Sequence, residues 1–237
     1  MSNKRNYLIW IAGALTALAL SVSCVLGQEN PDSTEPTRHL FQVTISAGST
    51  LSGPATDIEN AMPTSGFSQP ESHAGIGGIG LPWILSARYS IRPNVSVGFL
   101  ISNAPIGKTQ GHHADDLNLT VHYSVLAISP TVSFIYEDFV RAGIGPAVYI
   151  TKSAQSTPSD LIETRTATKI GVLLDFGLSL PLFDPFVADL GFQYRFVGTS
   201  DIGPFTANSS GQPAATMPLT SGNYSHALVS LGIGIQL

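Results

Sequence analysis

A two-residue alternation of apolar and small or polar side chains recurs along most of this chain and constrains its fold more than any other feature. From Ala227 to Leu237, every second residue is apolar, and the residues between are mostly glycine, serine and glutamine. A helix cannot separate two such sets, because its like faces recur every 3.6 residues rather than every 2. The alternation therefore predicts an all-β protein.

Eight segments carry this alternation, and each is expected to form one strand: 41–46, 85–92, 95–102, 119–136, 140–150, 170–180, 186–196 and 227–237. In the fourth segment the apolar set changes phase, from Leu119–Val125 to Val132–Tyr136. Pro130 lies between the two sets and has no N–H to donate to a strand ladder, so we expect a β-bulge there.

The charged residues of these segments all lie on the face opposite the apolar one. They are Arg88, Arg92, Arg141, Asp175, Asp189 and Arg195. That face is also rich in glycine and serine. These side chains provide too little apolar volume to form the dry core of a soluble protein. An apolar face directed at lipid explains the pattern, because a charge at the bilayer midplane costs roughly 2–4 kcal/mol. A soluble, lipocalin-like barrel is the alternative and requires the reverse orientation.

The connections between the eight segments alternate in length. Three are short, around Pro93-Asn94, Glu137-Asp138 and Phe183-Asp184, and four are long, covering 51–79, 103–116, 152–169 and 198–225. Short turns at one end and long loops at the other are typical of membrane barrels, with the turns periplasmic and the loops outside. We therefore predict an eight-stranded antiparallel up-and-down transmembrane β-barrel with both termini on the short-turn side.

Composition agrees with a membrane barrel. Charged residues make up 11% of the chain, against roughly 25% in soluble domains. A long uncharged stretch, 117–136, holds too many polar residues for a spanning helix. The balance is acidic, with a net charge of −5, which argues against nucleic acid as a partner.

The N-terminus predicts export. Lys4 and Arg5 precede an uncharged apolar run, and Gly27 ends it before polar residues begin, as in a cleaved signal peptide. We expect a signal peptide over 1–27, a short polar leader over 28–38 and the barrel over 39–237. Cleavage would leave nine basic and sixteen acidic residues, a net charge of −7. Cys24 offers lipoprotein processing as an alternative, although the residues before it make a poor lipobox.

Two segments resemble a known family. Val140-Arg141-Ala142-Gly143-Ile144-Gly145-Pro146-Ala147 and the closing Val229–Leu237 are similar to strands of the small outer-membrane β-barrel proteins, the OmpA/OmpX-like superfamily. The resemblance implies the barrel fold, location in the bacterial outer membrane, contact with its lipid, and recognition of the last strand by the barrel-assembly machinery. The family usually ends on Phe or Tyr, whereas this chain ends on Leu237.

The expected site is a polar network inside the barrel, since eight strands leave a lumen that side chains can fill. Its predicted members are Arg88, Arg92, His122, Arg141, Asp175, Asp189, Gln193 and Arg195. No catalytic, cofactor or metal site is predicted. The glycines of 75–80 match a dinucleotide pattern but lack its strand-to-helix setting. His112, His113, Asp115 and Asp116 could offer metal ligands, but adjacent residues rarely all turn to one ion, so we favour a solvated loop tip.

Three functions remain open from the sequence. The first is a structural or surface-interaction protein whose loops meet an extracellular ligand above a largely plugged barrel. The second is a narrow pore for small solutes, suggested by the glycine-rich and serine-rich lumen face. The third is a lipid-modifying hydrolase with Ser124 as nucleophile, His122 as base, and Asp175 or Asp189 as the orienting acid.

Overall fold

The computed structural model describes residues 41–51, 63, 67–74, 81–113, 118–137, 139–156, 161–207 and 215–237. The signal-peptide and leader predictions, and the glycine motif at 75–80, lie outside these residues. Leu40–Leu237 forms one compact unit. In the described part of the chain, no helix is both long enough and apolar enough to span a membrane.

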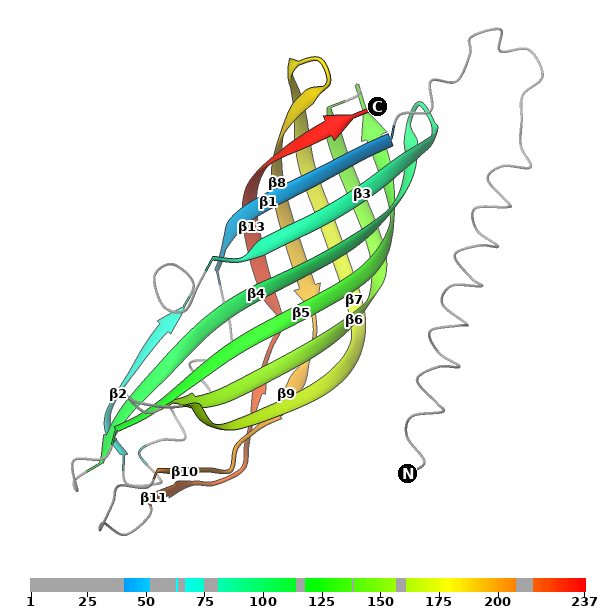
Figure 1. Ribbon diagram of the computed structural model, residues 1–237. Coiled ribbons are helices and arrows are strands. Elements are labelled where there is room, and N and C mark those ends of the chain that lie inside the picture. Colours follow the sequence, from blue (N-terminus) through cyan, green and yellow to red (C-terminus); the bar gives the residue numbers. More distant parts are fainter. Residues whose placement is uncertain are drawn as a thin grey trace, which may run out of the picture. The chain divides into compact units, whose positions relative to one another are not determined.

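Thirteen strands make up the described structure (Figure 1). They are β1 (Phe41–Thr50), β2 (Phe67–Ala74), β3 (Trp83–Arg92), β4 (Val95–His113), β5 (Asn118–Tyr136), β6 (Val140–Ser156), β7 (Leu161–Phe183), β8 (Phe186–Phe196), β9 (Thr199–Ile202), β10 (Phe205–Ala207), β11 (Ala215–Met217), β12 (Thr220–Asn223) and β13 (His226–Gln236). Eight of them, β1, β3–β8 and β13, pair antiparallel in a closed ring, with β4 also joined to β5 and β13 to β1. The predicted eight-stranded barrel is confirmed.

The barrel is apolar outside and polar inside, as predicted. Ile45 and Leu231 are each 65% exposed on the outer face. Inside, Asp189 is 3% exposed, and Ser230 and Thr44 are similarly buried. On β8 and β13, each 11 residues long, the outward apolar set covers the whole strand. That is the length a tilted strand needs to cross the hydrocarbon core, so these strands mark the height of an apolar belt.

Four neighbouring strands continue well past this belt at the long-loop end. β4 and β5 have 19 residues each, β6 has 17 and β7 has 23. They form a tall curved wall on one side of the barrel (Figure 1). The prediction of irregular loops over 103–116 and 152–169 was therefore wrong, because most of these residues continue the ladders. We call this wall, with β9–β12, the extension.

The orientation predicted for the upper part of β5 was also wrong. Leu119, Val121, Tyr123 and Val125 are completely buried inside rather than facing lipid. The pairing of β5 with β6 keeps one register from Thr120 to Tyr136, so Pro130 is not a bulge. The irregularity lies in the neighbouring strand, where the register shifts between Pro105 and Gly107 of β4.

The physical reason is that β5 passes from lipid into water. Within the belt its outward residues are apolar, such as Phe134 and Ile128, because they face lipid. Above the belt the outer face meets water, and the apolar residues turn inward to form a conventional core. Residues of β9–β12 complete that core: Ile202, Phe205, Met217 and the adjoining Tyr224. The Tyr123 and Tyr224 rings meet edge to face, with centroids 6.4 Å apart.

Candidate functional site: the lumen plug

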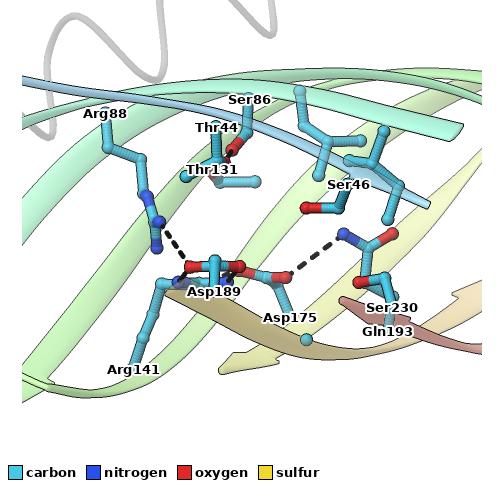
Figure 2. A pocket seen from close by; sticks show the side chains of 13 residues that line it. Thr44, Ser46, Ser86, Arg88, Thr131, Arg141, Asp175, Asp189, Gln193 and Ser230 are labelled. Carbon is cyan, nitrogen blue, oxygen red and sulfur yellow. Dashed lines mark hydrogen bonds and ion pairs between the residues drawn. The ribbon is translucent and has the colours of Figure 1, made fainter. Parts of the chain in front are cut away.

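Charged side chains from four strands meet across the lumen of the belt (Figure 2). Arg141 of β6 donates from Nε to Asp175 Oδ2 of β7 at 2.7 Å, and from Nη1 to Asp189 Oδ2 of β8 at 3.0 Å. Arg88 of β3 reaches across and donates from Nη2 to Asp189 Oδ2 at 3.0 Å. We call Arg88, Arg141, Asp175 and Asp189 the lumen plug.

Two cations and two carboxylates balance within the plug, and neutral groups add further hydrogen bonds. Ser179 Oγ donates to Asp189 at 2.8 Å, and Gln193 Nε2 donates to Asp175 at 3.2 Å. Each charge is therefore both paired and hydrogen-bonded. Such a buried network is tolerated only when it is complete, because a buried charge that loses its partner is costly.

A second layer lies beside the plug, towards the long-loop end. Arg195 is fully buried, and its Nη2 donates to Gln193 Oε1 at 2.8 Å. Its Nη1 lies 3.4 Å from His226 Nε2. His226 Nδ1 is 2.9 Å from the Tyr224 carbonyl oxygen, which can only accept. Nδ1 therefore carries the proton, and Nε2 presents its lone pair to Arg195.

Glycines leave the space that the two plug arginines occupy. Gly177 is the cross-strand partner of Arg141, and a Cβ at Gly177 would collide with the Arg141 guanidinium. Gly98 pairs with Arg88, and a Cβ there would come within 2.8 Å of Arg88 Cγ. The lumen glycines thus allow long side chains to lie flat across the barrel, which is how a narrow lumen becomes filled.

Little empty space remains around the plug. The cavity beside it measures about 10 Å³ and is lined by plug residues with Thr44, Ser46, Gln193 and Ser230 among others. That is room for about one water molecule. Above it, Tyr149, Leu173 and Leu228 join the buried core of the extension. The described side chains therefore close the lumen with a charged layer and an apolar layer.

Six of the eight residues predicted for the network meet in these two layers: Arg88, Arg141, Asp175, Asp189, Gln193 and Arg195. Arg92 is instead the last residue of β3, next to the short turn at 93–94. The placement of His122 in the lumen was wrong. His122 and Ser124 alternate with the buried Val121, Tyr123 and Val125 and so lie on the outer face. The three side chains of the hydrolase hypothesis therefore cannot meet, because His122 and Ser124 lie on the outer face and both aspartates lie in the lumen.

Sequence reasoning missed Ser179 and His226. Ser179 shares a face with Asp175 in the alternation of β7, so its place in the lumen could have been predicted. His226 lies just before the alternating segment 227–237, and its contact with Arg195 follows from their cross-strand register. Of the four residues that could offer metal ligands, Asp115 and Asp116 lie outside the described part of the chain.

Neither a protein-family model nor a curated protein sequence matches the chain. Solved structures do. The outer membrane protein OprG of Pseudomonas aeruginosa aligns over 87% of this chain and 99% of its own, at 10% identity and a TM-score of 0.50. Ail of Yersinia pestis, solved with the heparin analogue sucrose octasulfate, aligns over 84% of this chain and 99% of its own, at 11% identity and a TM-score of 0.46. Neisserial surface protein A aligns over 85% of this chain and 99% of its own, at 13% identity and a TM-score of 0.41.

At these identities the likeness concerns the fold alone. It agrees with what the side chains show independently: a closed ring of eight strands, a belt of exposed apolar residues, and buried charges in the lumen inside that belt. An apolar surface this extensive is stable only against lipid. The chain is a transmembrane β-barrel with the fold of the small outer-membrane barrel proteins, the class its sequence resembles.

Proposed function

We propose that this protein is a closed barrel of the bacterial outer membrane that acts at the cell surface, as a structural or surface-interaction protein. The observation that carries the proposal is the double closure of the lumen. The ion-paired plug fills the belt, and the buried core of the extension fills the space above it. A solute path through the barrel would have to break both layers.

The extension supports a role outside the membrane. β4–β7 rise beyond the belt as continuous ladders, and β9–β12 pack their apolar residues against the inside of this wall. Ordered strands with a core of their own present a firm surface, which lowers the entropic cost of ordering when a partner binds. By the general rule for such barrels, this long-loop end faces outward.

Bilayer conductance tests the proposal. The barrel is purified in detergent, checked for a heat-dependent shift in electrophoretic mobility, and added to planar bilayers beside an open porin treated identically. We expect the porin to give stepwise conductance and this barrel to give none. Reproducible steps from the heat-modifiable protein would instead establish the narrow pore and refute the closed barrel.

A further inference from the structure

Three nitrogen-bearing side chains gather on the outer face of the extension, directly above the apolar belt. Lys108 of β4 and His122 of β5 are cross-strand partners. Lys152 of β6 pairs with Ser124, which lies two residues from His122 on the same face of β5. The three therefore occupy adjacent outward positions on three neighbouring strands. We call them the basic patch.

The height of the patch follows from the register. Leu126 and Ile150 form the last apolar outward pair of β5 and β6. Lys152 lies two residues beyond Ile150, which is about 7 Å along the strand. His122 lies four residues beyond Leu126, or about 13 Å along a strand that tilts by roughly 40°. At that tilt Lys152 stands about 5 Å above the belt, and His122 and Lys108 stand about 10 Å above it. Lys152 therefore lies at the level of the lipid headgroups, which occupy roughly 5–8 Å outside the hydrocarbon core, and Lys108 lies just above them, within reach of its side chain.

Among the described positions next to the patch in its own sheet, one is acidic: Glu71 of β2 pairs with Gln110, two residues from Lys108 on the same face. The described outward residues of the extension on β4–β7 include Gln110, Thr120, Thr164, Thr166 and Thr168, and none of them is acidic. Lys152 has no acidic cross-strand partner, because it pairs with Ser124 of β5 and Thr166 of β7. The chain as a whole is acidic, with a net charge of −5, so this local excess of positive charge runs against its overall balance.

We infer that the basic patch binds the phosphate group of a phosphorylated lipid in the outward leaflet. This inference rests on the membrane insertion proposed above. Lysine chains at an interface lay their methylene stems along apolar groups and extend the ammonium to the headgroups. An anionic headgroup beside a lysine gains about 1 kcal/mol at a membrane surface, or roughly fivefold in affinity. The adjacent Ser124 and threonines add hydroxyl donors for phosphate oxygens.

His122 fits this site as a neutral hydrogen-bonding group. Partial burial, and secondarily the nearby Lys108 ammonium, lower the pKa of its imidazole. Near neutral pH the ring is therefore uncharged and can donate one hydrogen bond to a phosphate oxygen. The two lysines supply the charge of the site.

Native mass spectrometry of the purified barrel, titrated with phosphatidic acid or with phosphatidylcholine, tests the inference. The test variant is K108Q/K152Q. Its matched control is R165Q/K169Q, which removes the same charge from the opposite face of the extension, because Arg165 and Lys169 pair with the inward Ser153 and Tyr149. We expect phosphatidic acid to bind the wild type in preference to phosphatidylcholine. Binding should weaken about thirtyfold in K108Q/K152Q, at roughly fivefold per lysine, and less than twofold in the control.

Equal binding by wild type and K108Q/K152Q would overturn the inference, as would equal losses in both variants, which would indicate a response to net charge. Displacement of the lipid by equimolar inorganic phosphate would also overturn it, since the site would then take a free anion. A barrel that shows no heat-dependent mobility shift would refute membrane insertion itself, which is a separate outcome read before any lipid is added.

Discussion

At the scale of single residues, the barrel interior depends on the ion pairs of the lumen plug and on the small residues that leave space for its arginine side chains. Asp189 accepts hydrogen bonds from Arg88, Arg141 and Ser179, so three strands depend on one carboxylate. Gly177 and Gly98 leave the space over which the two arginines lie. The alternation placed these residues on one face, but which aspartate would meet which arginine depends on strand register, which the sequence pattern does not encode.

Asp189→Ala should destabilise the barrel by about 3–5 kcal/mol, because Arg88 and Arg141 would keep buried charges with fewer partners. Urea unfolding from lipid vesicles measures this, with fluorescence of Trp83, the only tryptophan after Trp10. Asp184→Ala is the matched control: it makes the same change in an exposed turn and should shift stability by no more than about 0.5 kcal/mol. Equal stability of the two variants would contradict the structural role of the plug.

The imidazole of His122 should titrate below the usual range for histidine. Burial disfavours its charged form, and Lys108 adds like-charge repulsion. Lys108→Gln should therefore raise the pKa of His122 without restoring it fully, because burial is the larger cause. NMR titration of labelled histidine measures both values, with the resonance assigned by its loss in His122→Gln. A pKa that does not move in Lys108→Gln would show that the two side chains do not interact.

At the scale of elements, β5 shows why one strand can mislead a prediction. Its residues alternate without interruption from Thr120 to Tyr136, yet the apolar set lies inside above the belt and outside within it. The sequence shows this only as a change of phase near Pro130, which a bulge would explain equally well. The choice depends on where lipid gives way to water, and that depends on neighbouring strands.

Phe205→Ala should loosen the extension while leaving the membrane barrel intact. Phe205 is fully buried in the core of the extension, and removing such a ring costs roughly 3–5 kcal/mol. Hydrogen exchange should rise at Leu119–Val125, while the heat-dependent mobility shift persists. Phe192→Ala removes the same ring from the lipid-facing belt, where Phe192 is 40% exposed, and should leave exchange in the extension unchanged. Equal protection in both variants would mean that the extension does not depend on this core.

At the scale of the whole molecule, the sequence predicted the strand number, the closed barrel and its polar interior, because lipid and water impose period-two patterns that are visible in single strands. It did not predict the extension. The residues of 103–113 include glycine, proline and asparagine, which loops also favour, and those of 161–169 are mostly threonine and charged residues. They become strands because β5 and β6 lie alongside to pair with them.

Short epitope tags should establish the orientation of the barrel. One tag is inserted between residues 115 and 116, in the sequence between β4 and β5, and another between 158 and 159, in the sequence between β6 and β7. Both tags should be labelled by antibody on intact cells. A tag at Asn94, in the short turn between β3 and β4, should be labelled only after permeabilisation, because short turns face the periplasm. The reverse pattern would place the extension and its basic patch on the inner side of the membrane.

The unbroken register of β5 has a consequence for how this protein can change over time. Deleting one residue near Ile128 would exchange the two faces of everything beyond it, exposing Leu119 and Val121 to water and enclosing polar groups. A one-residue deletion inside β5 would therefore need a compensating bulge, such as the register shift between Pro105 and Gly107 of β4. Because β5 is paired with β4 on one side and β6 on the other, a change in the height of the wall must involve adjacent strands together.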